Sequence, residues 1–366
     1  LRLLSQMLAE QGYHVRPVPD GPMALAAVQA EPPDLVLFDI RMPGMNGYEV
    51  CEHLKAGAQT CDVPIIFISA LGATQDKVRA FAVGGVDYVT KPFQVEEVLA
   101  RVETHLALRK LQKKLQDANR KMAQELALAG EVQTSFLPRD LPDIPGWQLA
   151  ATLKPARETS GDFFDFISLP KGRLGIVVAD VSDKGAGAAL YMALSWTLIR
   201  TYAAEYPTRP ETVLSAVNRR IIKDSDANHF VTVIYGILDL ETGTLVYCNE
   251  GHWPPYLIGP RHSENVPRLI NTGVPLGIFG DKTWEQGVVQ IAPGDVLVLY
   301  TDGIPEAQNA QGEFLGGDRL LETVRTNLGR PAREIQDAIL ADVKKFAGDT
   351  PQSDDIALIV LLRDHA

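Results

Sequence analysis

Four short acidic motifs are spread over the C-terminal two thirds of this chain. Each adjoins an apolar run of strand character, and carboxylates at strand ends can converge at one edge of a sandwich. Converging carboxylates repel one another and shift their pKa values upward, whereas hard divalent cations such as Mg²⁺ or Mn²⁺ remove that repulsion. One such motif alone is commonly a simple turn, but four in this arrangement predict a metal site. The motifs are GDFFD (Asp162, Asp165), VADVSDKG (Asp180, Asp183), YTDG (Asp302) and SDD (Asp354, Asp355).

The chemistry expected of such a site is hydrolysis of a phosphate ester. Two cations about 4 Å apart would hold a bridging water and lower its pKa, which supplies hydroxide near neutral pH. Arg157 precedes the first motif and could hold phosphate oxygens in a bidentate manner. No cluster of cysteine and histidine is present, which argues against zinc.

A second set of reactive side chains lies in the N-terminal third. Asp39, Ser69 and Lys91 each follow or end a short apolar run. A carboxylate, a hydroxyl and an ammonium at neighbouring strand ends can accept a phosphoryl group: the carboxylate attacks, and the other two hold the transferred oxygens. Each residue alone would most often be structural, but the triple is a specific signal.

Two kinds of sheet are expected to position these groups. Residues 1–105 alternate apolar runs with amphipathic stretches, which predicts a parallel sheet covered by helices on both faces. Such sheets bind ligands beyond the carboxyl ends of their strands. Residues 137–366 carry runs of strands interrupted by paired helical stretches, which predicts an α+β sandwich flanked by helices.

Residues 106–136 connect the two blocks and contain no proline. Apolar or small residues fall at alternating steps of three and four, interrupted where Glu125 takes a seam position; they are Leu108, Leu111, Leu115, Ala118, Met122, Ala129, Val132 and Phe136. This stripe fits either one amphipathic helix packed on its own chain or a parallel coiled coil that joins two chains into a homodimer. Pro138 and Pro142 are expected to end the helix.

Composition limits the class of protein. The 366 residues are 46% hydrophobic and 22% charged, with a net charge of −11, which argues against nucleic acid as the main partner. Three widely spaced cysteines predict neither a disulfide framework nor a zinc site and favour a cytoplasmic location. No apolar run is long enough to span a membrane.

The N-terminal block resembles the response-regulator receiver domain of two-component systems. The matching segments are FDIRMPGMNGYEV, IIFISA and DYVTKPF. The resemblance implies a flavodoxin-like fold, an upstream histidine kinase, Asp39 as phosphoacceptor, Ser69 and Lys91 as switch residues, and Tyr88 as the rotating aromatic. The family's first strand and its Mg²⁺-binding acidic pair are absent, so we expect an N-terminally truncated receiver; a receiver used only for packing is the alternative.

The C-terminal block resembles the metal-dependent protein phosphatase superfamily (protein phosphatase 2C-like), and within it the SpoIIE/RsbU class. The segments that carry the likeness include PARETSGDFFDF, VADVSDKGAGAALYMALS, NEGHWPPYLI, LYTDGIPEA and SDDIALIV. By this resemblance two Mn²⁺ or Mg²⁺ ions are held by Asp165, Asp180, Asp302 and Asp354 together with the carbonyl of Val181. Asp162 and Asp355 would support these ligands or bind a third ion. Glu250 stands where alanine is usual, and His252 is interpreted as a loop histidine satisfied by hydrogen bonds.

Together these patterns predict a receiver at 1–105, a helical coiled-coil linker at 106–136 and a phosphatase domain at 137–366. The expected activity is hydrolysis of phosphoserine or phosphothreonine on a signalling protein of the anti-anti-sigma type, under control of the receiver. A non-catalytic scaffold that binds phosphoproteins is the alternative.

Overall fold

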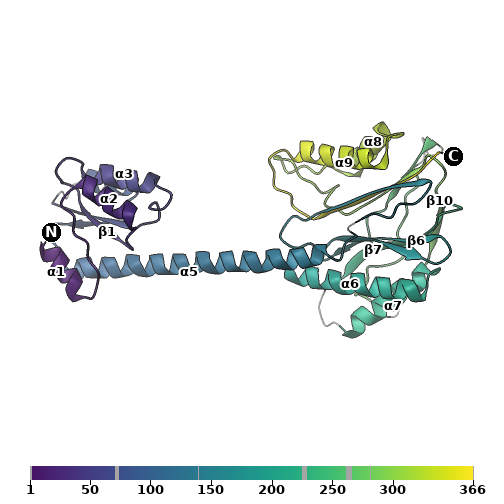
Figure 1. Ribbon diagram of the computed structural model, residues 1–366, viewed down its shortest axis with the longest axis horizontal. Coiled ribbons are helices and arrows are strands. Elements are labelled where there is room, and N and C mark those ends of the chain that lie inside the picture. The colour runs from purple at the N-terminus through teal and green to yellow at the C-terminus, as the bar shows by residue number, and fades with distance from the viewer. Residues whose placement is uncertain are drawn as a thin grey trace. The chain divides into compact units, whose positions relative to one another are not determined.

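The computed structural model describes residues 2–70, 74–138, 140–224, 229–260, 266–280 and 282–365. The chain divides into two compact units, Leu1–Lys121 and Met122–Ala366. One helix, α5 (Val95–Thr134), runs across this division (Figure 1). It begins about ten residues before the predicted linker.

The first unit is built around parallel strands in the order β1-β2-β3. Asn46 begins the helix after β1, because its side chain accepts hydrogen bonds from the amides of Tyr48 and Glu49 while the Glu49 carboxylate accepts from the Asn46 amide. Fully buried Ile65, Ile66 and Phe67 make β2 the centre of the core. The elements are α1 (Arg2–Glu10), α2 (Gly21–Ala30), β1 (Val36–Asp39), α3 (Gly47–Ala56), β2 (Ile65–Ser69), α4 (Thr74–Ala82), β3 (Asp87–Thr90) and the start of α5. The predicted parallel sheet is confirmed, whereas the loss of a first strand stays a prediction.

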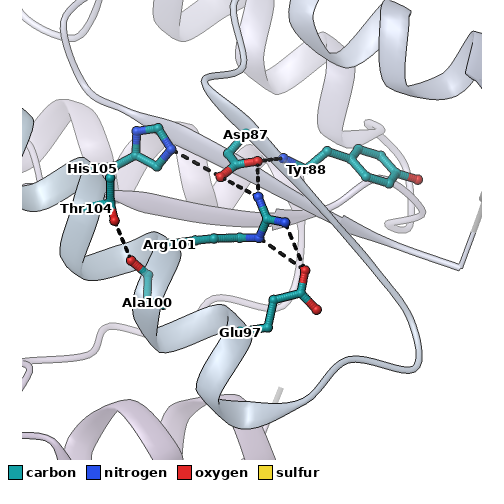
Figure 2. A network of polar contacts seen from close by, with 7 residues as sticks. All are labelled: Asp87, Tyr88, Glu97, Ala100, Arg101, Thr104 and His105. Carbon is teal, nitrogen blue, oxygen red and sulfur yellow. Dashed lines mark hydrogen bonds and ion pairs between the residues drawn. The ribbon is translucent and has the colours of Figure 1, made fainter.

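A polar network fixes the beginning of α5 to β3 (Figure 2). Arg101 donates to both carboxylate oxygens of Asp87, at 2.7 and 2.8 Å, and also pairs with Glu97 at 2.9 Å. The ring of His105 lies 3.2 Å from the Asp87 carboxylate. Further along, Arg109 donates to the carbonyls of Pro33 and Asp34 at 2.9 Å each. Four turns of α5 are therefore attached to the first unit.

The second unit is a sandwich of two antiparallel sheets. Its five-stranded sheet has the order β10-β8-β7-β6-β5 and its four-stranded sheet the order β4-β12-β11-β9. Helices α6 and α7 cover the first sheet, and α8 and α9 cover the second (Figure 1). The elements are β4 (Trp147–Lys154), β5 (Phe163–Leu169), β6 (Arg173–Val181), α6 (Ala186–Glu205), α7 (Pro210–Asp224), β7 (Val231–Asp239), β8 (Thr244–Glu250), β9 (Tyr256–Ile258), β10 (Gly287–Gln290), β11 (Val296–Tyr300), α8 (Gly317–Thr326), α9 (Ala332–Ala347) and β12 (Ile356–Arg363). This is the predicted α+β sandwich.

Apolar alternation explains why the two sheets pack together. On one face of β5, β6 and β7 the apolar side chains pack against α6 and α7. On the opposite face they pack against β11 and β12, in the layer between the two sheets. For example, Val177 belongs to the helix-facing cluster, whereas Ile176 and Val178 belong to the cluster between the sheets. The strand ends at one edge of this sandwich carry the acidic motifs.

The predicted seam of the linker is exposed in the single chain. Leu108, Leu111, Leu115 and Met122 are 51–63% exposed on α5. Pairing of this helix with a second copy stays a prediction. Across the described ranges, no helix combines the length and the apolarity needed to cross a bilayer.

Candidate active site

Strand pairing brings the acidic motifs of the second unit together. Asp162 immediately precedes β5 and Asp180 lies near the end of β6; because Phe163 pairs with Ala179, Asp162 stands opposite Asp180. Asp302 follows β11, and the pair Asp354–Asp355 precedes β12. The amide of Thr301 donates to the carbonyl of Ala357 at 3.1 Å, which holds these two ends side by side.

The electrostatics of these carboxylates show mutual repulsion in a buried place. Burial and then the charge of Asp180 raise the pKa of Asp162 well above its usual range. Burial, with Asp354 and Asp355 adding to it, raises the pKa of Asp180 to about 6. Burial, followed by the charges of Asp180 and Asp354, raises the pKa of Asp302 to about 7. Acidic groups whose pKa values are pushed up together are a frequent mark of functional sites.

One buried carboxylate oxygen in this cluster has no hydrogen-bond partner. Asp162 is 2% exposed, and its Oδ2 is unsatisfied among the described residues. An orphaned buried carboxylate oxygen is costly unless a ligand meets it. Asp162 therefore lies where a bound cation would remove an energetic penalty.

Asp354 has a cationic neighbour that the sequence did not reveal. The Lys184 ammonium lies 2.9 Å from its Oδ2 and also donates to the carbonyl of Ser353 at 2.7 Å. Lys184 follows the VADVSD motif. The same ammonium lowers the pKa values of Asp180 and Asp302, against the larger effect of burial.

Asp355 organises the loop between β4 and β5. Its carboxylate accepts hydrogen bonds from the Ala156 amide (2.7 Å), the Ser160 hydroxyl (2.8 Å) and the Gly161 amide (2.9 Å). With its lone pairs used in this way, Asp355 supports the site by holding residues 156–161 in place. Whether Asp355 supports the ligands or binds a third ion, the two roles that the resemblance implied, stays a prediction.

The C-terminal end of α5 contacts the same loop. The Gln133 side chain donates to the Ser160 carbonyl at 2.5 Å and accepts from the Ser160 amide at 2.9 Å. Three residues earlier, a Cβ added at Gly130 would lie 2.0 Å from the carbonyl oxygen of Glu158. The helix end is thus packed closely against the loop that Asp355 holds.

The structure does not bring Asp165 to the acidic cluster, which corrects the expectation that it is a metal ligand. Asp165 is 1% exposed, and Arg200 on α6 donates to both of its oxygens, at 2.5 and 2.8 Å. Burial still raises the pKa of Asp165, partly offset by Arg200. Alternation along β5 explains the difference, because Asp165 points to the helix-covered side of the sheet.

The remaining predicted residues of this unit lie close to the cluster. Arg157 is exposed within the loop that Asp355 holds. The carbonyl of Val181 faces Gly161, where a Cβ would lie 3.0 Å from that oxygen. His252 is fully satisfied: its ring lies 3.0 Å from the Thr232 hydroxyl and 3.1 Å from the Tyr300 carbonyl, and burial lowers its pKa to about 4. The interpretation of His252 as a structural histidine is supported.

The donor set fits a hard cation by its chemistry. Carboxylates with raised pKa values and an orphaned buried oxygen are the groups that Mg²⁺ or Mn²⁺ would satisfy. As the side chains stand in the described ranges, no three acidic, histidine or cysteine groups are already arranged as an ion site. The fit therefore rests on donor type and on Asp162 Oδ2.

In the first unit, the residues of the predicted phosphoacceptor site meet at the carboxyl ends of the strands. Asp39 ends β1, and its carboxylate forms an ion pair with Lys91. Ser69 ends β2, is 1% exposed, and its carbonyl accepts from the Lys91 amide at 2.8 Å. Tyr88, in β3, is buried at 6% exposure, with the Lys77 ammonium 5.9 Å from the centre of its ring.

Sequence reasoning missed Arg200, Lys184, Gln133 and Ser160. Gln133 lies in the predicted linker helix, where its residue type alone assigned no role. Arg200 lies in an apolar helical stretch, and its partly exposed side chain gave no local sign that it pairs with the buried Asp165.

Comparisons with known proteins give the family. The model of the Stage II sporulation protein E (SpoIIE) family matches residues 170–364, and that of the response regulator receiver domain matches residues 1–103. Protein IcfG of Synechocystis sp. (strain ATCC 27184 / PCC 6803 / Kazusa) is 34% identical over 66% of this chain and 42% of its own length. Phosphoserine phosphatase RsbU of Bacillus subtilis (strain 168) is 28% identical over 71% of this chain and 74% of its own length.

A solved structure shares the fold of the second unit. The SiaA-PP2C domain of Pseudomonas aeruginosa is 24% identical and superposes with a TM-score of 0.60 over 67% of this chain and 98% of that domain. This chain spans less than half the length of IcfG. The resemblances drawn from the motifs are confirmed: the chain belongs to the SpoIIE family, with a PP2C-like SpoIIE domain that follows a response regulator receiver domain.

Proposed function

We propose that this chain is a metal-dependent phosphatase that hydrolyses phosphoserine or phosphothreonine on a signalling protein. The observation that carries the proposal is the buried group of carboxylates at adjoining strand ends, with raised pKa values and an unsatisfied Asp162 oxygen. RsbU, a phosphoserine phosphatase by name, is similar over most of its length. A substrate of the anti-anti-sigma type is the expectation from the family resemblance.

The residues of the cluster have distinct roles in this proposal. Asp162, Asp180, Asp302 and Asp354, with the carbonyl of Val181, would hold two Mn²⁺ or Mg²⁺ ions. When bound, such ions neutralise phosphate charge and supply an acidified water.

Two further side chains act around these ligands. Asp355 keeps the 156–161 loop in place, and Arg157 on that loop would orient the phosphate oxygens by a bidentate contact. Asp165 stabilises the fold through Arg200 and takes no part in binding ions.

Manganese-dependent hydrolysis tests this function. The full chain should hydrolyse p-nitrophenyl phosphate and a phosphoserine protein only with Mn²⁺ or Mg²⁺, and Asp302→Asn should lose at least a hundredfold in kcat because a ligand that acts on developing charge is removed. Asp183→Asn is the matched control, since Asp183 is exposed beside the cluster. Binding of a phosphoprotein without any turnover would instead support the scaffold alternative.

We also propose that the receiver controls this activity through α5. Phosphorylation would occur on Asp39, from an upstream histidine kinase, and would rearrange Lys91 and Ser69. Tyr88 follows Asp87, whose carboxylate is tied to Arg101 at the beginning of α5 (Figure 2). At its other end α5 contacts the active-site loop through Gln133.

The regulation has its own test. Phosphatase rates should change when the full chain is treated with a small-molecule phosphoryl donor, and Asp39→Asn should abolish the change. Arg101→Met should also reduce it, because the Asp87 contact is lost while Asp39 stays intact. Equal rates with and without the donor would contradict this control.

We propose that α5 also joins two copies of the chain. The exposed seam of Leu108, Leu111, Leu115 and Met122 supports this, because apolar stripes at heptad spacing are stabilised by a second helix. Light scattering should give a dimer for the full chain, and Leu111→Asp with Leu115→Asp should give a monomer. A monomeric wild-type chain at micromolar concentration would contradict it.

A further inference from the structure

A cavity of about 200 Å³ lies beside the acidic cluster, between the C-terminal half of α9 and the segment that returns to β12. Gly303 and Ser353 are part of its wall, and each is the sequence neighbour of a carboxylate of the cluster, Asp302 and Asp354. Consecutive Cα atoms are about 3.8 Å apart. A substrate whose phosphate is at the cluster therefore has this cavity within reach of the next few residues.

The cavity has an apolar base and two cationic side chains. Val343, Ala307 and Ile356 contribute apolar surface, while Lys154, the last residue of β4, and Lys344, in the last turn of α9, bring ammonium groups. Both lysines are exposed. Within the described residues, no ion pair occupies either ammonium.

This placement of positive charge contrasts with its surroundings. The chain carries a net charge of −11, and the neighbouring site gathers carboxylates. An acidic substrate segment would be repelled by that site but attracted by two unpaired ammonium groups. A lysine in the last turn of α9 also interacts favourably with the helix dipole. Lys345 makes the same interaction but does not line the cavity, so the dipole alone does not account for Lys344 at that position.

We propose that this cavity receives an acidic side chain of the protein substrate, located one to three residues from the phosphorylated serine or threonine. The inference rests on the proposed phosphatase function and adds the sequence preference of its substrate. An extended peptide advances about 3.3 Å per residue, so one to three residues span the short distance from the carboxylate cluster to the adjoining cavity. A volume of this size is below that of pockets for whole small molecules, about 300–1,000 Å³, and suits one or two side chains.

The experiment compares synthetic phosphoserine peptides that carry Glu, Gln or Lys at each of the three positions on either side. The full chain is assayed with Mn²⁺ at low ionic strength. Peptides with Glu at the matching position should exceed the Gln peptides in kcat/KM by about fivefold, the size expected of two partly exposed ion pairs. The gain should appear mainly in KM and shrink as salt is added.

Variants then assign the preference to the cavity. Lys154→Ala and Lys344→Ala should each lower the preference for Glu, and the double variant should abolish it. Lys345→Ala, one residue along α9, should keep it. Hydrolysis of p-nitrophenyl phosphate, which has no flanking residues, should be unchanged in all of them.

The outcomes separate this inference from the function on which it rests. Equal kcat/KM for Glu and Gln peptides in the wild-type chain would overturn the inference, and so would a Glu preference that survives in the double variant, even if hydrolysis proceeds normally. Absence of Mn²⁺-dependent hydrolysis with every substrate, p-nitrophenyl phosphate included, would overturn the phosphatase function itself.

Discussion

The repulsion among the clustered carboxylates of the proposed active site predicts that Asp302→Asn stabilises the metal-free protein while it abolishes activity. Asp302 has its pKa raised from 3.8 to about 7. At pH 8 the folded state holds this group ionised against its preference. An acid with a raised pKa loses stability as pH rises from its unfolded pKa of 3.8 towards its folded pKa of about 7, and the full cost is present above that. A neutral amide of similar shape removes that cost.

The size of the effect follows from the shift. A difference of about three pKa units corresponds to about 4 kcal/mol at high pH. Asp302 is partly exposed, and solvent screening reduces the figure to about 2 kcal/mol. For a unit the size of Met122–Ala366, this is a rise of about 4–8 °C in Tm. At pH 5 the difference should fall to less than half, because the wild-type carboxyl is then protonated in the folded state.

Scanning calorimetry in EDTA at pH 8 measures this change. The transition of the phosphatase unit should move up in Asp302→Asn, whereas that of the receiver unit should stay where it is and serve as an internal reference. Asp183 is an exposed neighbour, so Asp183→Asn should change the free energy of unfolding by no more than about 0.5 kcal/mol, as surface substitutions do. Its transition should therefore stay close to that of the wild type. Added Mn²⁺ should raise the Tm of the wild type more than that of the variant.

A lower or unchanged Tm for Asp302→Asn in EDTA, with the control behaving as expected, would refute the reasoning. The carboxylates would then be stabilised in the metal-free state by contacts other than those described, and their raised pKa values could not be used as an argument for a cation site.

Three further predictions concern the rest of the phosphatase unit. Arg200→Met should destabilise it by about 3–4 kcal/mol in urea unfolding, because Asp165 is left buried and unpaired; adding Asp165→Asn should recover most of the loss, and no recovery would contradict the pairing. Gly130→Ala should lower stability, since the new Cβ would meet the Glu158 carbonyl at 2.0 Å, although helix propensity alone predicts a gain of about 1 kcal/mol; the sign of the change in Tm decides. Burial lowers the pKa of His252 from 6.5 to about 4, so the free energy of unfolding of the wild type should fall by about 2 kcal/mol as pH falls from 7 to 5. His252→Gln should lose less Tm between the two pH values, and equal losses in the two proteins would contradict this.

Much of the fold could be read from the sequence because burial leaves a periodic trace. The runs that contain Ile65–Ser69 and Ile356–Arg363 are apolar without interruption, as strands covered on both faces must be. The linker helix was expected from its spacing of apolar residues, but it begins at Val95. Its first turns carry Arg101 and His105 to meet Asp87, and a contact across the fold leaves no trace in local periodicity.

The gathering of the acidic motifs could be predicted from their positions at strand ends, whereas the direction of each side chain could not. Asp162 and Asp165 belong to one motif, GDFFD, and no local property separates them. Three residues apart on an extended strand, they point to opposite faces. Only the sheet, with α6 on one side and the cluster at its edge, assigns Asp165 to Arg200 and Asp162 to the other carboxylates.

The residues that contact these carboxylates and their loop come from distant parts of the chain. Ser160 and Gly161 donate hydrogen bonds to the Asp355 carboxylate, and the Gln133 side chain on α5 is hydrogen-bonded to the backbone of Ser160. A cluster that repels itself is easily opened by a small change in its supports, because each lost contact adds to an existing strain. We therefore expect a shift of α5 at Gln133 to loosen the loop next to Asp162. The contact between Gln133 and Ser160 is therefore the point at which we propose that α5 acts on the site.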